Sequence, residues 1–203
     1  MATHPPTQFA LLSRILHWLM AALLLTMLFI GVAMVSSLGD YHKLVALHRP
    51  LGILILLLAI IRLINRKLTT LPPFPPTMSP LERKVASLSE RLLYFLMIAL
   101  PLVGWGMLSA GNYPIVMFGP VHLPPILPAN PMLYAILRKT HTIFAYLLFL
   151  TFLAHLGGVL FHTLIIRDRI LNRMALWPVQ HKGEATESPK PITPNPPTRS
   201  EKL

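Results

Sequence analysis

Three histidines interrupt an otherwise apolar stretch at residues 138–167. They are His141, His155 and His162, which follow one another at intervals of 14 and 7 positions. Since an α-helix turns by about 100° per residue, all three fall on one helical face, with His141 and His155 roughly 21 Å apart along the axis. Ionisable side chains inside a membrane span are costly and rare, so they mark functional sites. The pattern predicts chemistry at two depths of one helix.

Four segments are apolar over about 20 residues, the length that crosses a bilayer. We expect helices at roughly 9–36, 45–65, 80–109 and 138–167. Pro131 is an alternative, earlier start for the last helix. Pro50 would lie in the first turn of the second helix, where a missing N–H is tolerated. The predicted fold is an all-α membrane protein, a bundle of four transmembrane helices.

One domain of residues 9–177 holds these helices, and a terminal segment flanks it on each side. Residues 1–8 are polar and contain proline, so we expect a flexible N-terminus. Residues 178–203 are rich in Pro, Lys, Glu, Ser and Thr, which predicts a disordered C-terminal tail.

Basic residues are distributed unequally over the two ends of the expected bundle. One end carries Lys43, Arg49, Arg138 and Lys139. The other end, which holds both termini, carries Arg14, Arg66, Lys67, Arg83, Lys84, Arg91, Arg167, Arg169 and Arg173. The positive-inside rule therefore places both termini in the cytoplasm. Because the bases flank apolar spans, the net charge of +11 indicates contact with the lipid bilayer and not with nucleic acid.

This topology sorts the histidines by depth. His48 and His141 lie near the outer face, whereas His17, His155 and His162 lie in the inner half. A tetrahedral metal site needs every ligand within about 2 Å of one ion, which two depths exclude. Two imidazoles on facing helices instead fit the two axial positions of a haem iron, which leaves no position for oxygen and makes the haem an electron carrier. We therefore expect two haems between the helices, with either His155 or His162 opposite His17.

The composition narrows the cofactor and the class of protein. Of the 203 residues, 54% are hydrophobic and 12% are charged, as in membrane proteins. The absence of cysteine from the sequence excludes disulfides, Cys-ligated zinc or iron–sulfur sites, and covalent attachment of haem. Any haem is therefore a non-covalently bound haem b.

A further ionisable residue, Arg62, lies 14 positions after His48 and therefore on the same helical face. A buried arginine needs an anion, yet the apolar parts of the four spans contain no Asp or Glu. A haem propionate would supply that charge. The alternative is that Arg62 extends to the inner headgroups together with Arg66 and Lys67.

Short motifs around these residues occur in the order known from one family. They are R-I-L-H-W around His17, L-H-R-P-L-G and I-I-R-L at His48 and Arg62, A-L-P-L-V-G in the third helix, and T-H followed by A-H at His141 and His155. Over residues 9–175 the chain resembles the bacterial cytochrome b561 family, which consists of di-haem b-type cytochromes of the inner membrane. The resemblance implies that His17 pairs with His155 around the inner haem, and His48 with His141 around the outer haem.

The resemblance also implies electron transfer coupled to the quinone pool. One branch of the family oxidises superoxide outside the membrane and passes the electron to ubiquinone. His162 matches a family position associated with that chemistry, which implies a role in quinone binding or proton transfer. The outer cations Lys43, Arg49, Arg138 and Lys139 would steer superoxide towards the outer haem. Their alternative role is contact with lipid headgroups.

Two functions follow from these expectations. The first is a self-contained membrane oxidoreductase that moves single electrons from an outer-face donor, with superoxide as a candidate, through two haems to quinone. The second is a haem-bearing membrane anchor, the cytochrome b subunit of a larger respiratory dehydrogenase or hydrogenase, whose partner subunits carry the catalysis. A proton-coupled transporter is disfavoured because the spans lack the carboxylates that such relays use.

Overall fold

The computed structural model describes residues 6, 8–37, 39–117, 119–168 and 170–177. The tail predicted at 178–203 and most of the flexible segment predicted at 1–8 lie outside the described residues. Gln8 is described and is held in place, because its side-chain amide donates to the carbonyl of Asn172 at 2.9 Å.

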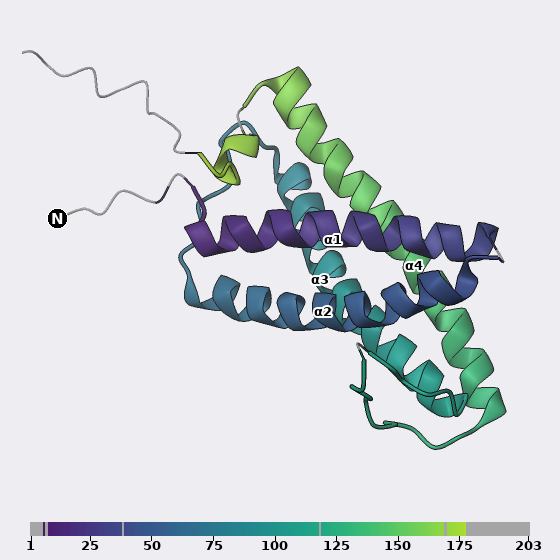
Figure 1. The fold of residues 1–203 in the computed structure, drawn as a ribbon. Coiled ribbons are helices and arrows are strands. Elements are labelled where there is room, and N and C mark those ends of the chain that lie inside the picture. The colour runs from purple at the N-terminus through teal and green to yellow at the C-terminus, as the bar shows by residue number, and fades with distance from the viewer. Residues whose placement is uncertain (1–5, 7, 38, 118, 169, 178–203) are drawn as a thin grey trace, which may run out of the picture.

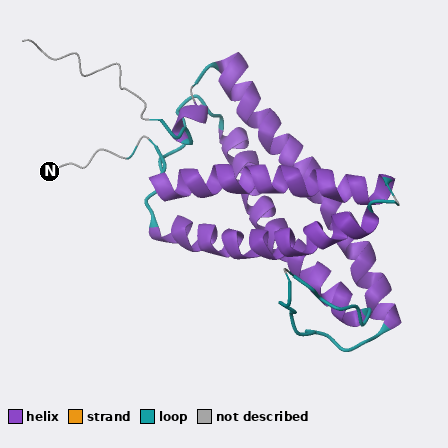
Figure 2. Cartoon of the chain, in the orientation of Figure 1, coloured by secondary structure: helices purple, strands orange, loops and turns teal. Residues whose placement is uncertain are grey.

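Four long helices make up most of the described chain (Figure 2). They are α1 (Leu11–Ser36), α2 (Tyr41–Leu68), α3 (Pro80–Ala110) and α4 (Pro131–Leu160). All four are long and apolar enough to cross a membrane, and the span that includes α4 extends to Ile166. Within the described residues, the extended pairing is limited to an isolated bridge between Val116 and His122. The predicted bundle of four membrane helices is confirmed.

The helices form two hairpins, α1 with α2 and α3 with α4, which cross one another (Figure 1). Each helix contributes to the core between them, with Met20, Ala59, Leu96 and Leu148 all buried. Large apolar side chains on the outer surfaces are exposed instead, as Phe29 is at 68%. This distribution is expected of membrane helices, because lipid covers apolar side chains that a soluble protein would have to bury.

The second helix begins earlier than predicted, at Tyr41 instead of residue 45, and ends at Leu68. Pro50 therefore lies inside the helix and not in its first turn, so this prediction was wrong. Prolines favour the first turn of a helix, but the residues before Pro50 continue the helix for about two and a half turns. Pro50 leaves the carbonyl of Ala46 without its helical donor, and α2 bends in this part (Figure 1).

The fourth helix takes the earlier of its two predicted starts. Pro131 is its first residue, and Oδ1 of Asn130 caps it by accepting from the N–H of Leu133 at 3.0 Å. The α-helix ends at Leu160 and passes into a π turn, η1 (Phe161–Ile166). Gly157 and Gly158 weaken the α-helix just before this turn.

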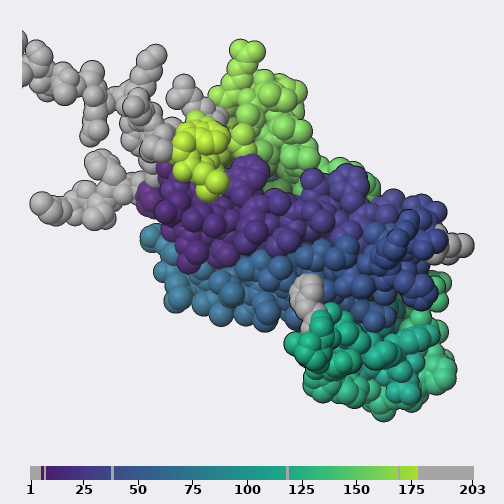
Figure 3. All heavy atoms as spheres, in the orientation of Figure 1, coloured from purple at the N-terminus to yellow at the C-terminus, as the bar shows by residue number. Residues whose placement is uncertain are grey.

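The chain after η1 folds back over the start of α1. Residues 170–177, which include a short helix η2 (Ile170–Arg173), lie against the N-terminal part of α1 (Figure 3). Arg14 donates to the carbonyl of Ala175 at 2.6 Å, and the indole N–H of Trp18 donates to the carbonyl of Met174 at 2.8 Å. These contacts bring the first and the last described residues to the same end of the bundle.

Candidate functional site

His48 of α2 and His141 of α4 face each other near the end of the bundle opposite the termini. Their ring centroids are 6.1 Å apart, and the ring planes are inclined by 63°. An imidazole nitrogen binds a metal at about 2 Å and the ring centroid lies about 1 Å beyond it, so two axial imidazoles on one iron have centroids about 6 Å apart. Nδ1 of His48 is buried and has no hydrogen-bond partner among the described residues. Both observations fit a haem iron held between the two rings.

Gly104 of α3 makes room for this pair. A Cβ atom at Gly104 would lie 3.3 Å from Cε1 and 3.5 Å from Nδ1 of His141. The glycine therefore lets the imidazole lie directly against the backbone of α3. The sequence analysis did not predict this contact, because the motif A-L-P-L-V-G contains the glycine but gives no indication of its neighbour on α4.

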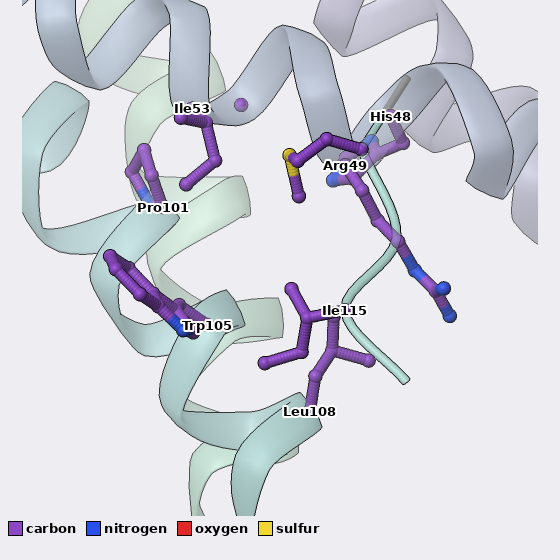
Figure 4. Close-up of a pocket in the computed structure, with 9 residues that line it drawn as sticks. His48, Arg49, Ile53, Pro101, Trp105, Leu108 and Ile115 are labelled. Carbon is purple, nitrogen blue, oxygen red and sulfur yellow. The ribbon is translucent and has the colours of Figure 1, made fainter. Parts of the chain in front are cut away.

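An apolar pocket opens beside His48 (Figure 4). It is lined by His48, Arg49, Gly52, Ile53, Pro101, Trp105, Leu108, Ile115 and Met117. Figure 4 shows Ile53 and Pro101 on one side, with Leu108 and Ile115 on another, while His48 and Arg49 project from α2. Its walls are mostly apolar, with His48 and Arg49 as the ionisable groups among them.

The inner end of the bundle holds a second group of predicted site residues. Nη2 of Arg62 lies 3.0 Å from Nδ1 of His17, and the guanidinium carbon lies 5.3 Å from the centroid of the Tyr94 ring. His155 of α4 is within electrostatic range of His17. The structure thus brings His17 and Arg62 into direct contact and places His155 near them.

Arg62 and Arg66 differ in how their charges are compensated. Arg66 forms an ion pair with Glu90 of α3, with Nη1 and Oε1 2.6 Å apart. Arg62 makes no ion pair with any described carboxylate. A guanidinium can only donate hydrogen bonds, so Nδ1 of His17 must be the acceptor in their contact.

His162 lies apart from both pairs, in the π turn. It is only 4% exposed, and its Nδ1 lies 2.7 Å from Oδ2 of Asp168. Burial would raise the pKa of the Asp168 carboxyl, but hydrogen bonds from His162, Thr77 and the N–H of Ile170 outweigh it and hold that pKa below its usual value. Sequence reasoning missed Asp168 and Thr77. A polar residue six positions after His162 is visible in the sequence, but α-helical spacing does not predict their contact.

Groups of three or more His, Asp or Glu side chains that could hold a metal ion are absent from the described part of the chain. The two rings of the outer pair face each other with centroids 6.1 Å apart. At the inner end, Arg62 contacts His17, and His155 lies within electrostatic range of both. His162 belongs to a separate hydrogen-bonded pair.

Four apolar helices with histidines from different helices facing one another define a membrane cytochrome of the four-helix type. The chain belongs to the prokaryotic cytochrome b561 family, whose model matches residues 8–176. It is therefore a multi-pass bacterial membrane protein and a b-type cytochrome that transfers electrons.

Three relatives illustrate the match. Cytochrome b561 homolog 2 of Escherichia coli (strain K12) is 30% identical over 176 residues, which cover 85% of this chain and 93% of the relative. Cytochrome b561 homolog 1 of the same organism is 26% identical over 168 residues, covering 78% and 92%. A probable superoxide oxidase CybB of Yersinia pestis is 29% identical over 128 residues, covering 63% and 72%.

Proposed function

We propose that the protein binds two b-type haems and passes single electrons from a donor at the outer face of the bacterial inner membrane to quinone. The outer haem lies between His48 and His141, and the inner haem between His17 and His155. The observation that carries this proposal is the 6.1 Å separation of the His48 and His141 ring centroids, which suits two axial ligands of one iron. Haem bound in this way supplies an iron that takes up and releases one electron without binding oxygen.

Arg62 supports the inner haem. A histidine that ligates a metal through one ring nitrogen usually carries a proton on the other. If His17 bound iron through Nε2, its Nδ1 would be a donor and would no longer accept from Arg62. Arg62 would then need a new acceptor, and we assign it to a haem propionate because the nearest described carboxylate, Glu90, is paired with Arg66 and forms no ion pair with Arg62.

His155 is the better candidate for the partner of His17. His155 lies within electrostatic range of His17, whereas His162 lies in the π turn beyond the end of α4, beside Asp168. We therefore keep the pairing that the family resemblance implies. His162 remains available for a different role, which we propose to be quinone binding or proton transfer at the inner face. Its position in a π turn supports this role, because such turns are frequent at functional sites.

The donor at the outer face is proposed to be superoxide. One relative is named as a probable superoxide oxidase, and cations lie at the outer end of the bundle. Lys43 is 84% exposed and pairs with Asp40, so its charge is partly offset. Arg49, Arg138 and Lys139 remain as the residues that would attract a small anion.

Haem counting tests the proposal. In the detergent-purified protein we expect two haems b per chain by the pyridine haemochrome method, with reduced spectra unaffected by carbon monoxide. His48→Ala and His17→Ala should each remove one haem, whereas His42→Ala, at an exposed position of α2, should retain both. A single haem in the unmodified protein would contradict the proposal, and so would binding of carbon monoxide. Turnover of superoxide and quinone by the isolated chain would further exclude an anchor that depends on a catalytic partner subunit.

A further inference from the structure

His162 and Asp168 form a buried pair at the inner end of the bundle. Nδ1 of His162 and Oδ2 of Asp168 are 2.7 Å apart, and the two side chains are 6% and 3% exposed. The carboxylate is fixed by two further donors. Oγ1 of Thr77 donates to Oδ2 at 3.0 Å, and the N–H of Ile170 donates to Oδ1 at 3.2 Å. Thr77 and the N–H of Ile170 therefore hold the Asp168 carboxylate in its orientation towards His162.

The backbone joins the same two residues. The N–H groups of Arg167 and Asp168 both point to the carbonyl of His162, the latter at 3.3 Å. Arg167 adopts the left-handed conformation, with φ at 58°, which ends the π turn and turns Asp168 back towards the helix. The imidazole and the carboxylate are thus held together as one local unit.

This unit determines which ring nitrogen of His162 carries the proton. An ionised carboxylate only accepts hydrogen bonds, so the nitrogen that faces Asp168 must be the donor. That nitrogen is Nδ1, and Nε2 makes no hydrogen bond within the described part of the chain. Nε2 is therefore the ring atom that is left for a ligand.

We propose that Asp168 is a positioning residue for quinone reduction, which holds His162 with Nδ1 protonated and Nε2 directed at a quinone oxygen. The inference rests on the proposed function, since it requires a quinone at the inner face.

The proton and electron balance of this step is simple. Reduction of quinone to quinol takes two electrons, which come from two oxidations of the outer donor, and two protons. His162 gives the proton on Nε2 to one quinone oxygen, so an N–H bond breaks and an O–H bond forms. Water from the inner aqueous phase supplies the proton for the other oxygen and then restores the proton on Nε2. Nδ1 keeps its own proton throughout and continues to donate it in the hydrogen bond to Asp168.

Other charged groups act on the pair more weakly. Glu82 from the first turn of α3 and Arg173 from η2 lie within electrostatic range of it. Their charges are opposite and offset one another in part. Thr77 is uncharged. Asp168, in direct contact, therefore provides the dominant charge at His162.

The test is the reoxidation of the haems by quinone, which does not depend on the outer donor. Full-length protein is reduced with a stoichiometric amount of dithionite and mixed with ubiquinone-1, and the haem absorbance is followed by stopped flow from pH 5 to 9. Asp168→Asn should retain both haems but slow the reoxidation at saturating ubiquinone-1 by about tenfold or more. The pH profile of its rate should also differ from that of the unmodified protein, because a neutral amide replaces the carboxylate that accepts from Nδ1 of His162. Asp168→Glu should keep the unmodified pH profile.

Each outcome bears on a distinct claim. An unchanged rate and pH profile in Asp168→Asn, with slow reoxidation in His162→Gln, would overturn the role of Asp168 and leave that of His162. Unmodified kinetics in both variants would overturn both roles, and an unmodified protein that ubiquinone-1 cannot reoxidise would overturn the proposed function itself. A pH shift in Asp168→Glu as large as in Asp168→Asn would assign the effect to packing.

Two further variants complete the design. Asp40→Asn removes an exposed carboxylate at the opposite end of the bundle and should behave as the unmodified protein does. If Asp168→Asn fails to bind haem, Thr77→Val serves instead, because it removes only the hydroxyl that donates to Oδ2. An unchanged reoxidation rate and pH profile in Thr77→Val would then overturn the positioning role.

Discussion

Arg62 extends from α2 to α1 and donates from Nη2 to Nδ1 of His17 across 3.0 Å. One turn further along α2, Arg66 is paired with Glu90 instead. The two arginines lie on one helix face but have different partners. Arg66 is paired with a carboxylate, whereas Arg62 contacts a neutral imidazole. This difference makes Arg62 the residue that should respond most to an anionic cofactor.

Replacing Arg62 should affect the inner haem alone. Arg62→Gln removes a positive charge beside His17. A positive charge nearby favours the reduced haem over the oxidised haem, so its removal should lower the midpoint potential of one haem. The expected fall is about 40 mV for each kcal/mol of interaction lost. A potentiometric titration followed by absorbance measures it. Arg66→Gln is the matched control, and equal shifts in both variants would contradict a specific contact with a propionate.

Enlarging Gly104 should disturb the outer haem. A Cβ atom there lies 3.3 Å from His141, so Gly104→Ala requires a small shift of the ring, and Gly104→Val requires a large one. We expect partial loss of one haem in the first variant and its complete loss in the second, measured as haem per chain. Gly31→Ala is the control, because nothing lies within 4 Å of a Cβ at that position. Full haem content in Gly104→Val would contradict the assignment.

The inner end should loosen in acid. Since the pKa of Asp168 is lowered by folding, the stability that its ionised form contributes is complete above the unfolded value, about 3.9, and is lost as the pH falls through the folded value. The Ile170 N–H donates to Asp168, so its protection against hydrogen exchange, relative to an unstructured amide at the same pH, should fall below about pH 4. In Asp168→Asn this acid dependence should disappear. Exchange that is equally acid-sensitive in the variant would point to another carboxylate.

Replacing Arg167 with glycine should stabilise the folded protein. Its φ of 58° is unfavourable for a residue with a Cβ atom by about 1 kcal/mol. Arg167→Gly should therefore raise the thermal unfolding midpoint by a few degrees, whereas Arg167→Val should lower it. Thermal unfolding followed by circular dichroism in detergent distinguishes them. A lower midpoint in Arg167→Gly would mean that the side chain contributes more than its backbone strain costs.

Much of this fold could be predicted from the sequence because membrane helices carry their signal locally. The apolar runs locate all four spans, and the depth of His48 and His141 predicts their approach before any contact is known. Pro50 misled the prediction of a helix start, since its preference for the first turn is only a tendency that packing within a bundle overrides.

The contacts that were not predicted are those between distant parts of the chain. Thr77 and Asp168 are 91 positions apart, and their hydrogen bond depends on the π turn that ends the fourth span. Gly104 contacts His141 because α3 and α4 pack together, and the sequence motif around Gly104 does not predict that packing. The sequence contained these residues, but their function follows only from three-dimensional proximity.

The segment that lies over α1 has a consequence for the order of events during synthesis. The Arg14 and Trp18 side chains belong to the first of the four spans to be synthesised. They donate to the carbonyls of Ala175 and Met174, which the ribosome produces about 160 residues later. Until then the indole N–H of Trp18 lacks this acceptor, and Arg14 has Gln8 as its partner within the described residues. The inner end of the bundle can therefore close only after the fourth span has been inserted, and a nascent chain arrested before Met174 should expose this end to proteases that the finished protein resists.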